Sequence, residues 1–148
     1  PNACEDGWDF LPAIDRARTV GIGAASELPY SPDGTCVEIE PLVRVTNVTV
    51  AISARDRRKL VAGTGPVLAG MEVFEDLFHY KSGIYEHAAG RSVGLHAVLI
   101  VGYDDEDSCW IVKNSWGADW GEQGFFKIAY GQCSIEDYSF IGVEAALV

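Results

Sequence analysis

Two apolar stretches joined by an acidic turn dominate the last third of the chain. Residues 95–103 and 109–113 are rich in valine, isoleucine and aromatic residues, and residues 104–107 between them read Asp-Asp-Glu-Asp. Short apolar runs bounded by turn residues are typical of buried strands. The sequence therefore predicts an antiparallel pair of strands, and this limits the chain to folds that are built on a sheet.

Outside this pair, the pattern is a helical first third followed by a β-rich remainder. Residues 8–20 place Trp8, Leu11 and Ile14 at three-residue steps among charged residues, as in an amphipathic helix. Ser53 with a carboxylate three residues later is a weak helix start, which predicts a helix to about residue 62. Further strands are predicted at residues 43–50, 67–71 and 124–129.

Composition excludes several classes of function. The chain has 148 residues, the length of one ordinary domain, and a formal net charge of −11. This charge argues against nucleic acid and against an anionic membrane surface as partners. No apolar run approaches the length of a membrane span, and no signal peptide is recognised. The four cysteines form no C-x-x-C pair, so we expect no metal site and no cofactor.

Two polar residues lie where the paired strands begin and end. His96 starts the first stretch, Asn114 directly follows the second, and two adjacent antiparallel strands bring such positions within hydrogen-bond reach. Imidazole can serve a cysteine nucleophile as general base and acid, and an asparagine oxygen can orient its ring. An indole such as Trp116 would exclude water from that hydrogen bond. His79 and His87 have no motif around them and are expected to be solvated.

The segments around these residues resemble the papain-like cysteine peptidases, the C1 family. The resemblance is carried by GLHAVLIVGYD around His96, WIVKNSWG around Asn114 and the following WGEQGFFKI. Upstream, the segment before the family's histidine is similar to two stretches of this chain, GPV and YKSGIY. The family's CNGG…GI…SE.YPY…C stretch resembles a further part of the chain, which contains CEDGW, GI, ELPY and Cys36. The resemblance covers almost the whole chain, and the KNSWG and WG.xG pair at this spacing is highly specific.

The resemblance implies an α+β papain-like fold in incomplete form. A remnant of the helical subdomain would cover residues 1–44, and an antiparallel, barrel-like β subdomain would cover residues 45–148. The implied activity is that of a thiol endopeptidase, which cleaves polypeptide substrates through a thioester acyl-enzyme without a cofactor or metal.

Site roles also follow from the resemblance. His96 would be the general base and acid, Asn114 would orient it, and Trp116 would shield the pair. Gly7 would offer backbone hydrogen bonds to an extended peptide. The main specificity pocket would be lined by Trp8, Gly70 and Leu95. Because Gly70 has no side chain, this pocket is expected to accept a bulky apolar residue.

The family's nucleophilic cysteine lies in a QGxCGSCWAF-like segment, and this sequence contains none. Cys4 precedes His96 by only 92 residues, whereas the family spacing is roughly 130–150. We therefore expect the C-terminal two-thirds of a peptidase, with the thiol supplied by a companion chain or a missing N-terminal segment. The alternative is a catalytically silent papain-like module that binds peptide or protein. A transglutaminase-like site is disfavoured, because such sites usually place an aspartate where Asn114 stands.

The cysteines carry one further expectation. An even number without a zinc pattern favours disulfides, and hence an extracellular, periplasmic or lysosome-like oxidising compartment; four buried thiols in a cytosolic protein are the alternative. Many family members pair a cysteine near Cys133 with one just before the histidine, so here the resemblance implies Cys109 as the partner of Cys133. Cys4 and Cys36 resemble cysteines with partners in the absent segment, and their pairing stays open.

Overall fold

The computed structural model describes residues 8–27 and 40–148. Within these residues the chain forms two α-helices, two short 3-10 helices and seven strands of one mixed sheet. It divides into two compact units, residues 1–48 with 144–148 and residues 49–143. This division lies close to the predicted boundary between residues 44 and 45, and the assignment of subdomains stays a prediction. No helix among the described residues has the length and apolar character to cross a membrane.

The first unit contains helix α2, which spans Phe10–Thr19 and confirms the helix predicted at residues 8–20. Of the apolar residues in this helix, only Ile14 is buried, whereas Leu11 is exposed to solvent. Strand β1 (Val43–Ala51) begins in this unit, where Ile22 forms an isolated antiparallel bridge with Val43.

The second unit begins its helical part with α3, which spans Ala54–Thr64. The Ser53 side chain accepts a hydrogen bond from the Asp56 backbone nitrogen at 3.1 Å, and this N-cap satisfies a donor that the first helical turn leaves free. The helix ends before Gly65, whose positive φ of 90° suits a glycine. The weak start signal at Ser53 thus predicts the helix correctly.

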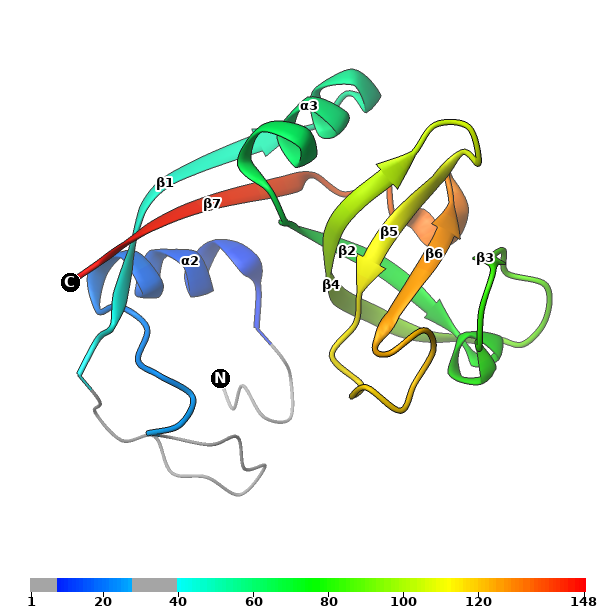
Figure 1. Ribbon diagram of the computed structural model, residues 1–148, viewed down its shortest axis with the longest axis horizontal. Helices are drawn as coiled ribbons and strands as arrows, with labels where there is room; N and C mark the ends of the chain where they lie inside the picture. Colours follow the sequence, from blue (N-terminus) through cyan, green and yellow to red (C-terminus); the bar gives the residue numbers. More distant parts are fainter. Residues whose placement is uncertain (1–7, 28–39) are drawn as a thin grey trace. The chain divides into compact units, whose positions relative to one another are not determined.

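The strand order in the sheet is β1-β7-β2-β4-β5-β6-β3 (Figure 1). The β3–β6 pair is parallel, whereas the β2–β4, β4–β5 and β5–β6 pairs are antiparallel. The bounds of the strands after α3 are Val67–Phe74 for β2, Ile84–Tyr85 for β3, Ser92–Asp104 for β4, Cys109–Lys113 for β5, Phe125–Ala129 for β6 and Phe140–Leu147 for β7. The 3-10 helices are η1 (Glu75–His79) and η2 (Gln132–Ser134).

The predicted hairpin is the β4–β5 pair. The Asp104 carboxylate closes its turn by accepting hydrogen bonds from the backbone nitrogens of Glu106 and Asp107 at 3.0 and 3.1 Å. A bulge lies between Ile100 and Gly102, where β4 carries one residue more than β5. The acidic run therefore forms the hairpin turn, and its first residue, Asp104, stabilises that turn.

The core of the second unit lies on one face of these strands. Strand β2 alternates strictly, and its buried residues are Val67, Ala69, Met71 and Val73. The largest fully buried side chains are Trp110, Phe126 and Phe140. Removal of one such aromatic side chain typically costs about 3–5 kcal/mol, so these three residues carry much of the stability of the unit.

The predicted disulfide between Cys109 and Cys133 is wrong for this structure, in which both are free, buried thiols. Cys109 starts β5 opposite Ala129 of β6, close to the charges of Lys127 and Asp104. Cys133 belongs to η2 and lies beside the hydroxyl of Tyr85. The two thiols therefore have different surroundings. Cys4 and Cys36 lie outside the described residues.

Candidate active site

The structure brings His96 and Asn114 together. His96 lies on β4, Asn114 is the first residue after β5, and the histidine Nε2 is 2.9 Å from the asparagine Oδ1. Strand pairing explains this contact, because the β4–β5 ladder ends with the pair Leu99–Lys113, and Asn114 directly follows Lys113. His96 lies three residues from the same end of the ladder on β4, so antiparallel pairing brings the two residues to one end of the hairpin. The hydrogen-bond reach predicted from the sequence is confirmed.

A second contact fixes the direction of that hydrogen bond. The backbone nitrogen of Ser115 donates to Asn114 Oδ1 at 2.8 Å, which identifies this atom of the amide as the oxygen. An amide oxygen only accepts, so His96 Nε2 must donate. In a neutral ring the other nitrogen, Nδ1, then carries no hydrogen and can take up a proton. The hydrogen bond thus defines one tautomer of a neutral His96 ring.

Asn114 is itself held rigidly. Its side chain is 7% exposed, and its backbone nitrogen donates to the Gly124 oxygen at 2.9 Å. The amide Nδ2 has no hydrogen-bond partner among residues 8–27 and 40–148. An unpaired buried donor costs about 1–3 kcal/mol. The Asn114 side chain therefore keeps its oxygen bonded to His96 while its amide nitrogen stays without a partner among these residues.

An aromatic cluster covers the pair. The Trp116 ring centroid lies 5.3 Å from that of His96. Behind it, Phe78 of η1 stacks on Trp116 at 4.9 Å, and Trp120 meets Trp116 edge-on at 4.9 Å. Trp120 also packs edge-on against Phe126, a fully buried residue of the core. Trp116 therefore packs beside the His96 ring, and Phe78 is a member of this cluster that the sequence did not indicate.

Glycines shape the loop that carries this cover. Gly117, Gly121 and Gly124 all have positive φ, a region that other residues rarely adopt. At Gly121 a side chain would also collide, because an added Cβ would lie 2.6 Å from the backbone oxygen of Phe125. The glycine spacing in this loop therefore follows from a tight turn, in which the Gly124 oxygen accepts from the Asn114 backbone nitrogen and the two tryptophans pack on each other.

Of the residues predicted to bind substrate, two lie on neighbouring strands. Gly70 of β2 pairs with Ala97 of β4, and Leu95 on β4 is 70% exposed, as a substrate contact would be. The space beside Gly70 is bounded by Tyr138, since an added Cβ would lie 3.4 Å from its ring. The space therefore has a wall that the sequence did not predict. Trp8 is exposed and belongs to the first unit, and Gly7 lies outside the described residues.

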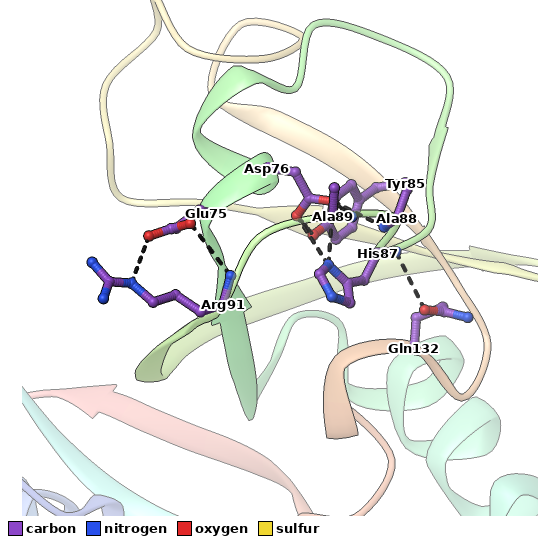
Figure 2. Close-up of polar contacts among 8 residues, drawn as sticks. All are labelled: Glu75, Asp76, Tyr85, His87, Ala88, Ala89, Arg91 and Gln132. Atoms are coloured by element: carbon purple, nitrogen blue, oxygen red, sulfur yellow. Dashed lines mark hydrogen bonds and ion pairs between the residues drawn. The ribbon is translucent and has the colours of Figure 1, made fainter.

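A second polar cluster surrounds Asp76 in η1 (Figure 2). Its carboxylate accepts the Tyr85 hydroxyl at 2.6 Å and the backbone nitrogens of Ala88 and Ala89 at 2.9 and 3.0 Å. The ring nitrogen Nδ1 of His87 lies 3.2 Å from both carboxylate oxygens. Burial opposes ionisation, but the Tyr85 hydroxyl and the other donors outweigh it and hold the pKa of Asp76 well below its usual range.

The Asp76 cluster holds the loop that leads to the histidine strand. Next to it in Figure 2, the Glu75 carboxylate accepts from Arg91 Nε at 2.8 Å, directly before β4 begins. His87 is half-buried and stacks on Phe74 at 3.7 Å. The expectation that His87 is solvated is therefore wrong, because Asp76 and Phe74 give it specific partners. No cluster of metal-ligating side chains occurs among residues 8–27 and 40–148.

Comparisons with known proteins identify the family and relatives of this chain. The family model described as papain family cysteine protease matches residues 1–143. The chain is 51% identical over 152 residues to cathepsin B-like CP1 of Giardia intestinalis, covering 89% of this chain and 50% of that protein. Cathepsin B-like CP3 of the same organism is 36% identical over 154 residues, covering 91% and 51%.

Solved structures show the same relationship. Procathepsin B S9 from Trypanosoma congolense matches with a TM-score of 0.75 and 27% identity, over 92% of this chain and 52% of that one. Procathepsin L2 from Tenebrio molitor matches with a TM-score of 0.76 and 27% identity, over 88% and 45%. The chain therefore has a partial papain-like fold and spans about half the length of these relatives. It belongs to the papain family of cysteine proteases.

Proposed function

We propose that this chain supplies the histidine–asparagine half of a thiol endopeptidase that acts on extended polypeptides. The observation that carries the proposal is the 2.9 Å contact between His96 Nε2 and Asn114 Oδ1, covered by Trp116. This contact fixes the ring and leaves Nδ1 free to exchange a proton with a thiol.

The reaction follows from that tautomer. Nδ1 of His96 takes the proton of a cysteine thiol, and the thiolate attacks the peptide carbonyl carbon to form a carbon–sulfur bond. When the tetrahedral intermediate collapses, the carbon–nitrogen bond breaks and the imidazolium gives its proton to the leaving amine. Water then hydrolyses the thioester, with Nδ1 again as base, and releases the acid product and the thiol.

The nucleophile has to come from elsewhere than the buried thiols of this chain. Burial raises the pKa of Cys133 to about 11 and also raises the pKa of Cys109, so neither forms a thiolate readily near neutral pH. Cys4 lies in a sequence frame that does not match the family's nucleophile. We propose that a companion chain or a preceding segment brings the thiol, and that the protein works in an extracellular, periplasmic or lysosome-like oxidising compartment.

A peptide-based, irreversible thiol reagent tests the proposal on the native preparation of the protein. Intact masses under denaturing conditions should show one labelled site on a companion chain or a preceding segment. The substitution His96→Ala should abolish this labelling, whereas His79→Ala should not, because His79 is exposed and outside the pair. Absence of labelling in the unsubstituted protein would refute the peptidase proposal in favour of a silent, peptide-binding module.

A further inference from the structure

The short helix η1 is fastened to the loop of residues 86–91, which joins β3 to β4. The Asp76 carboxylate is the centre of this contact, because it accepts hydrogen bonds from the Tyr85 hydroxyl and from the backbone nitrogens of Ala88 and Ala89 (Figure 2). Burial and the neighbouring carboxylate raise the pKa of Tyr85, so its hydroxyl stays protonated and donates. One ionised side chain of η1 thus holds the loop by its middle.

Contacts beside Asp76 keep the end of the loop against η1. The backbone nitrogen of Glu75 donates to the backbone oxygen of Arg91 at 3.2 Å, directly before β4 begins. Gly90 lies so close to η1 that an added Cβ would be 2.8 Å from the Cβ of Glu75. The start of β4 and η1 are therefore in direct contact, and a shift of one displaces the other.

The first part of β4 needs this contact because the sheet supports it on one side only. The ladder between β4 and β5 begins at Leu99, so among the described strands only β2 pairs with residues 92–98. That pairing is itself irregular, with a bulge between Val73 and Phe74. His96 lies in this part of the strand. Its position therefore depends on where the loop delivers the start of β4.

Helix η1 also carries Phe78, two residues after Asp76. The Phe78 ring stacks on Trp116 with the ring centroids 4.9 Å apart and the planes 19° apart, and Trp116 lies 5.3 Å from the ring of His96. Phe78 is 48% exposed, so burial does little to fix its ring. The position of η1, which the Asp76 carboxylate holds, therefore sets how Phe78 lies on Trp116.

We propose that Asp76 is a positioning residue for His96, because its carboxylate fixes both the start of β4 and the η1 ring that packs on Trp116. One route reaches the His96–Asn114 hydrogen bond through the histidine strand, and the other reaches it through the aromatic cluster beside it. The structural part of this proposal stands by itself, whereas the catalytic part rests on the proposed function. A loosely held imidazole takes the proton of a thiol more slowly, because fewer of its orientations are productive.

Proton NMR on the full chain tests the structural part. Asp76→Ala removes both carboxylate oxygens, so the His96 Hε2 should exchange with water faster, on the order of tenfold, and nuclear Overhauser effects between the Phe78 and Trp116 rings should weaken. Asp104→Ala is the matched control, because Asp104 also accepts from two backbone nitrogens but lies at the far end of β4, and it should leave both signals unchanged. Unchanged signals in a folded Asp76→Ala overturn the proposal. Equal changes in both variants overturn it too, because they would reflect a general loss of stability.

Native-state hydrogen exchange on the unsubstituted chain keeps the proposal testable should Asp76→Ala not fold. At low urea concentrations, the backbone amides of Ala88 and Ala89 and the His96 Hε2 should open with one common free energy. The two backbone amides that Asp104 holds should open with a different one. If the His96 hydrogen opens independently of the alanine amides, or if all of these hydrogens open together, the proposal is wrong.

The catalytic part is measured on the longest natural form of the protein that contains this chain, with the peptide-based thiol reagent. The rate of labelling should fall on the order of tenfold in Asp76→Ala and stay unchanged in Asp104→Ala. An unchanged rate in Asp76→Ala refutes the catalytic part. No labelling of the unsubstituted protein refutes the proposed function, and the NMR result still decides the structural part.

Discussion

Replacement of Asn114 by alanine tests the centre of the candidate site. The substitution removes an oxygen that accepts two hydrogen bonds, from His96 Nε2 at 2.9 Å and from the Ser115 backbone nitrogen at 2.8 Å. The backbone bond from residue 114 to the Gly124 oxygen stays available, so the loop keeps one of its anchors. The change is therefore local to the histidine ring.

The expected loss of stability follows from these contacts. Each hydrogen bond contributes about 1 kcal/mol net, and removal of a side chain that is 7% exposed adds a packing term of similar size. We expect Asn114→Ala to lower the free energy of unfolding by about 2–3 kcal/mol. Lys113→Ala, one residue earlier and exposed, should change it by less than about 0.5 kcal/mol.

Two assays report on the prediction. Urea unfolding of the three proteins gives the stability difference. Proton NMR at neutral pH should show a slowly exchanging His96 Hε2 signal in the unsubstituted chain, because Asn114 accepts this hydrogen and Trp116 covers it. The signal should vanish into water exchange in Asn114→Ala and persist in Lys113→Ala. A persistent signal in Asn114→Ala would show that Asn114 does not hold the ring, and the assignment of the tautomer would fail.

Three further predictions concern the surroundings of the site. Asp76→Asn should lower the free energy of unfolding by about 2 kcal/mol near neutral pH. Because the fold lowers the pKa of Asp76, the contribution of its carboxylate to stability is present above the ordinary aspartate pKa of about 4 and is lost as pH falls below it. In urea unfolding, the stability difference between the two proteins should therefore shrink in acid, and a difference that stays constant with pH would contradict this. Gly121→Ala should lower stability by more than about 2 kcal/mol, since its Cβ would lie 2.6 Å from a carbonyl oxygen of β6. Gly83 also has a positive φ but lies in open space, so Gly83→Ala should cost only about 1 kcal/mol in thermal unfolding. Cys109 and Cys133 should react with a soluble thiol reagent only on unfolding, because both thiols are buried and burial raises their pKa. Fast labelling of either of these two residues in the native chain, located by peptide mass, would exclude their burial.

Local pattern was sufficient for the framework of the site. The apolar runs that became β4 and β5, with the acidic turn between them, predict a hairpin, and a hairpin alone brings His96 and Asn114 close together at one end. Ser53 likewise predicts the start of α3, because an N-cap acts through the nearest backbone donors. These signals can be read along the chain since each depends on residues a few positions apart, or on one short turn.

Other expectations failed because partners distant in the sequence decided them. His87 has no motif, yet η1 gives it Asp76 and the end of β2 gives it Phe74. Strand β7 was not predicted, since the sequence of Phe140–Leu147 lacks a clean alternation and its pairing depends on β2 and β1. The implied Cys109–Cys133 disulfide is absent from the structure, in which both thiols are free and have different polar neighbours.

By itself, the sequence determined strands β1, β2, β4, β5 and β6, the N-cap of α3 and the histidine–asparagine pair of this protein, because periodicity and short-range hydrogen bonding act within a few residues. Only the tertiary structure decided that Arg57 is buried in a helix segment that reads as solvated, and that Tyr138 covers Gly70. Such contacts join residues about seventy or eighty positions apart, and packing sets their geometry after the local elements have formed.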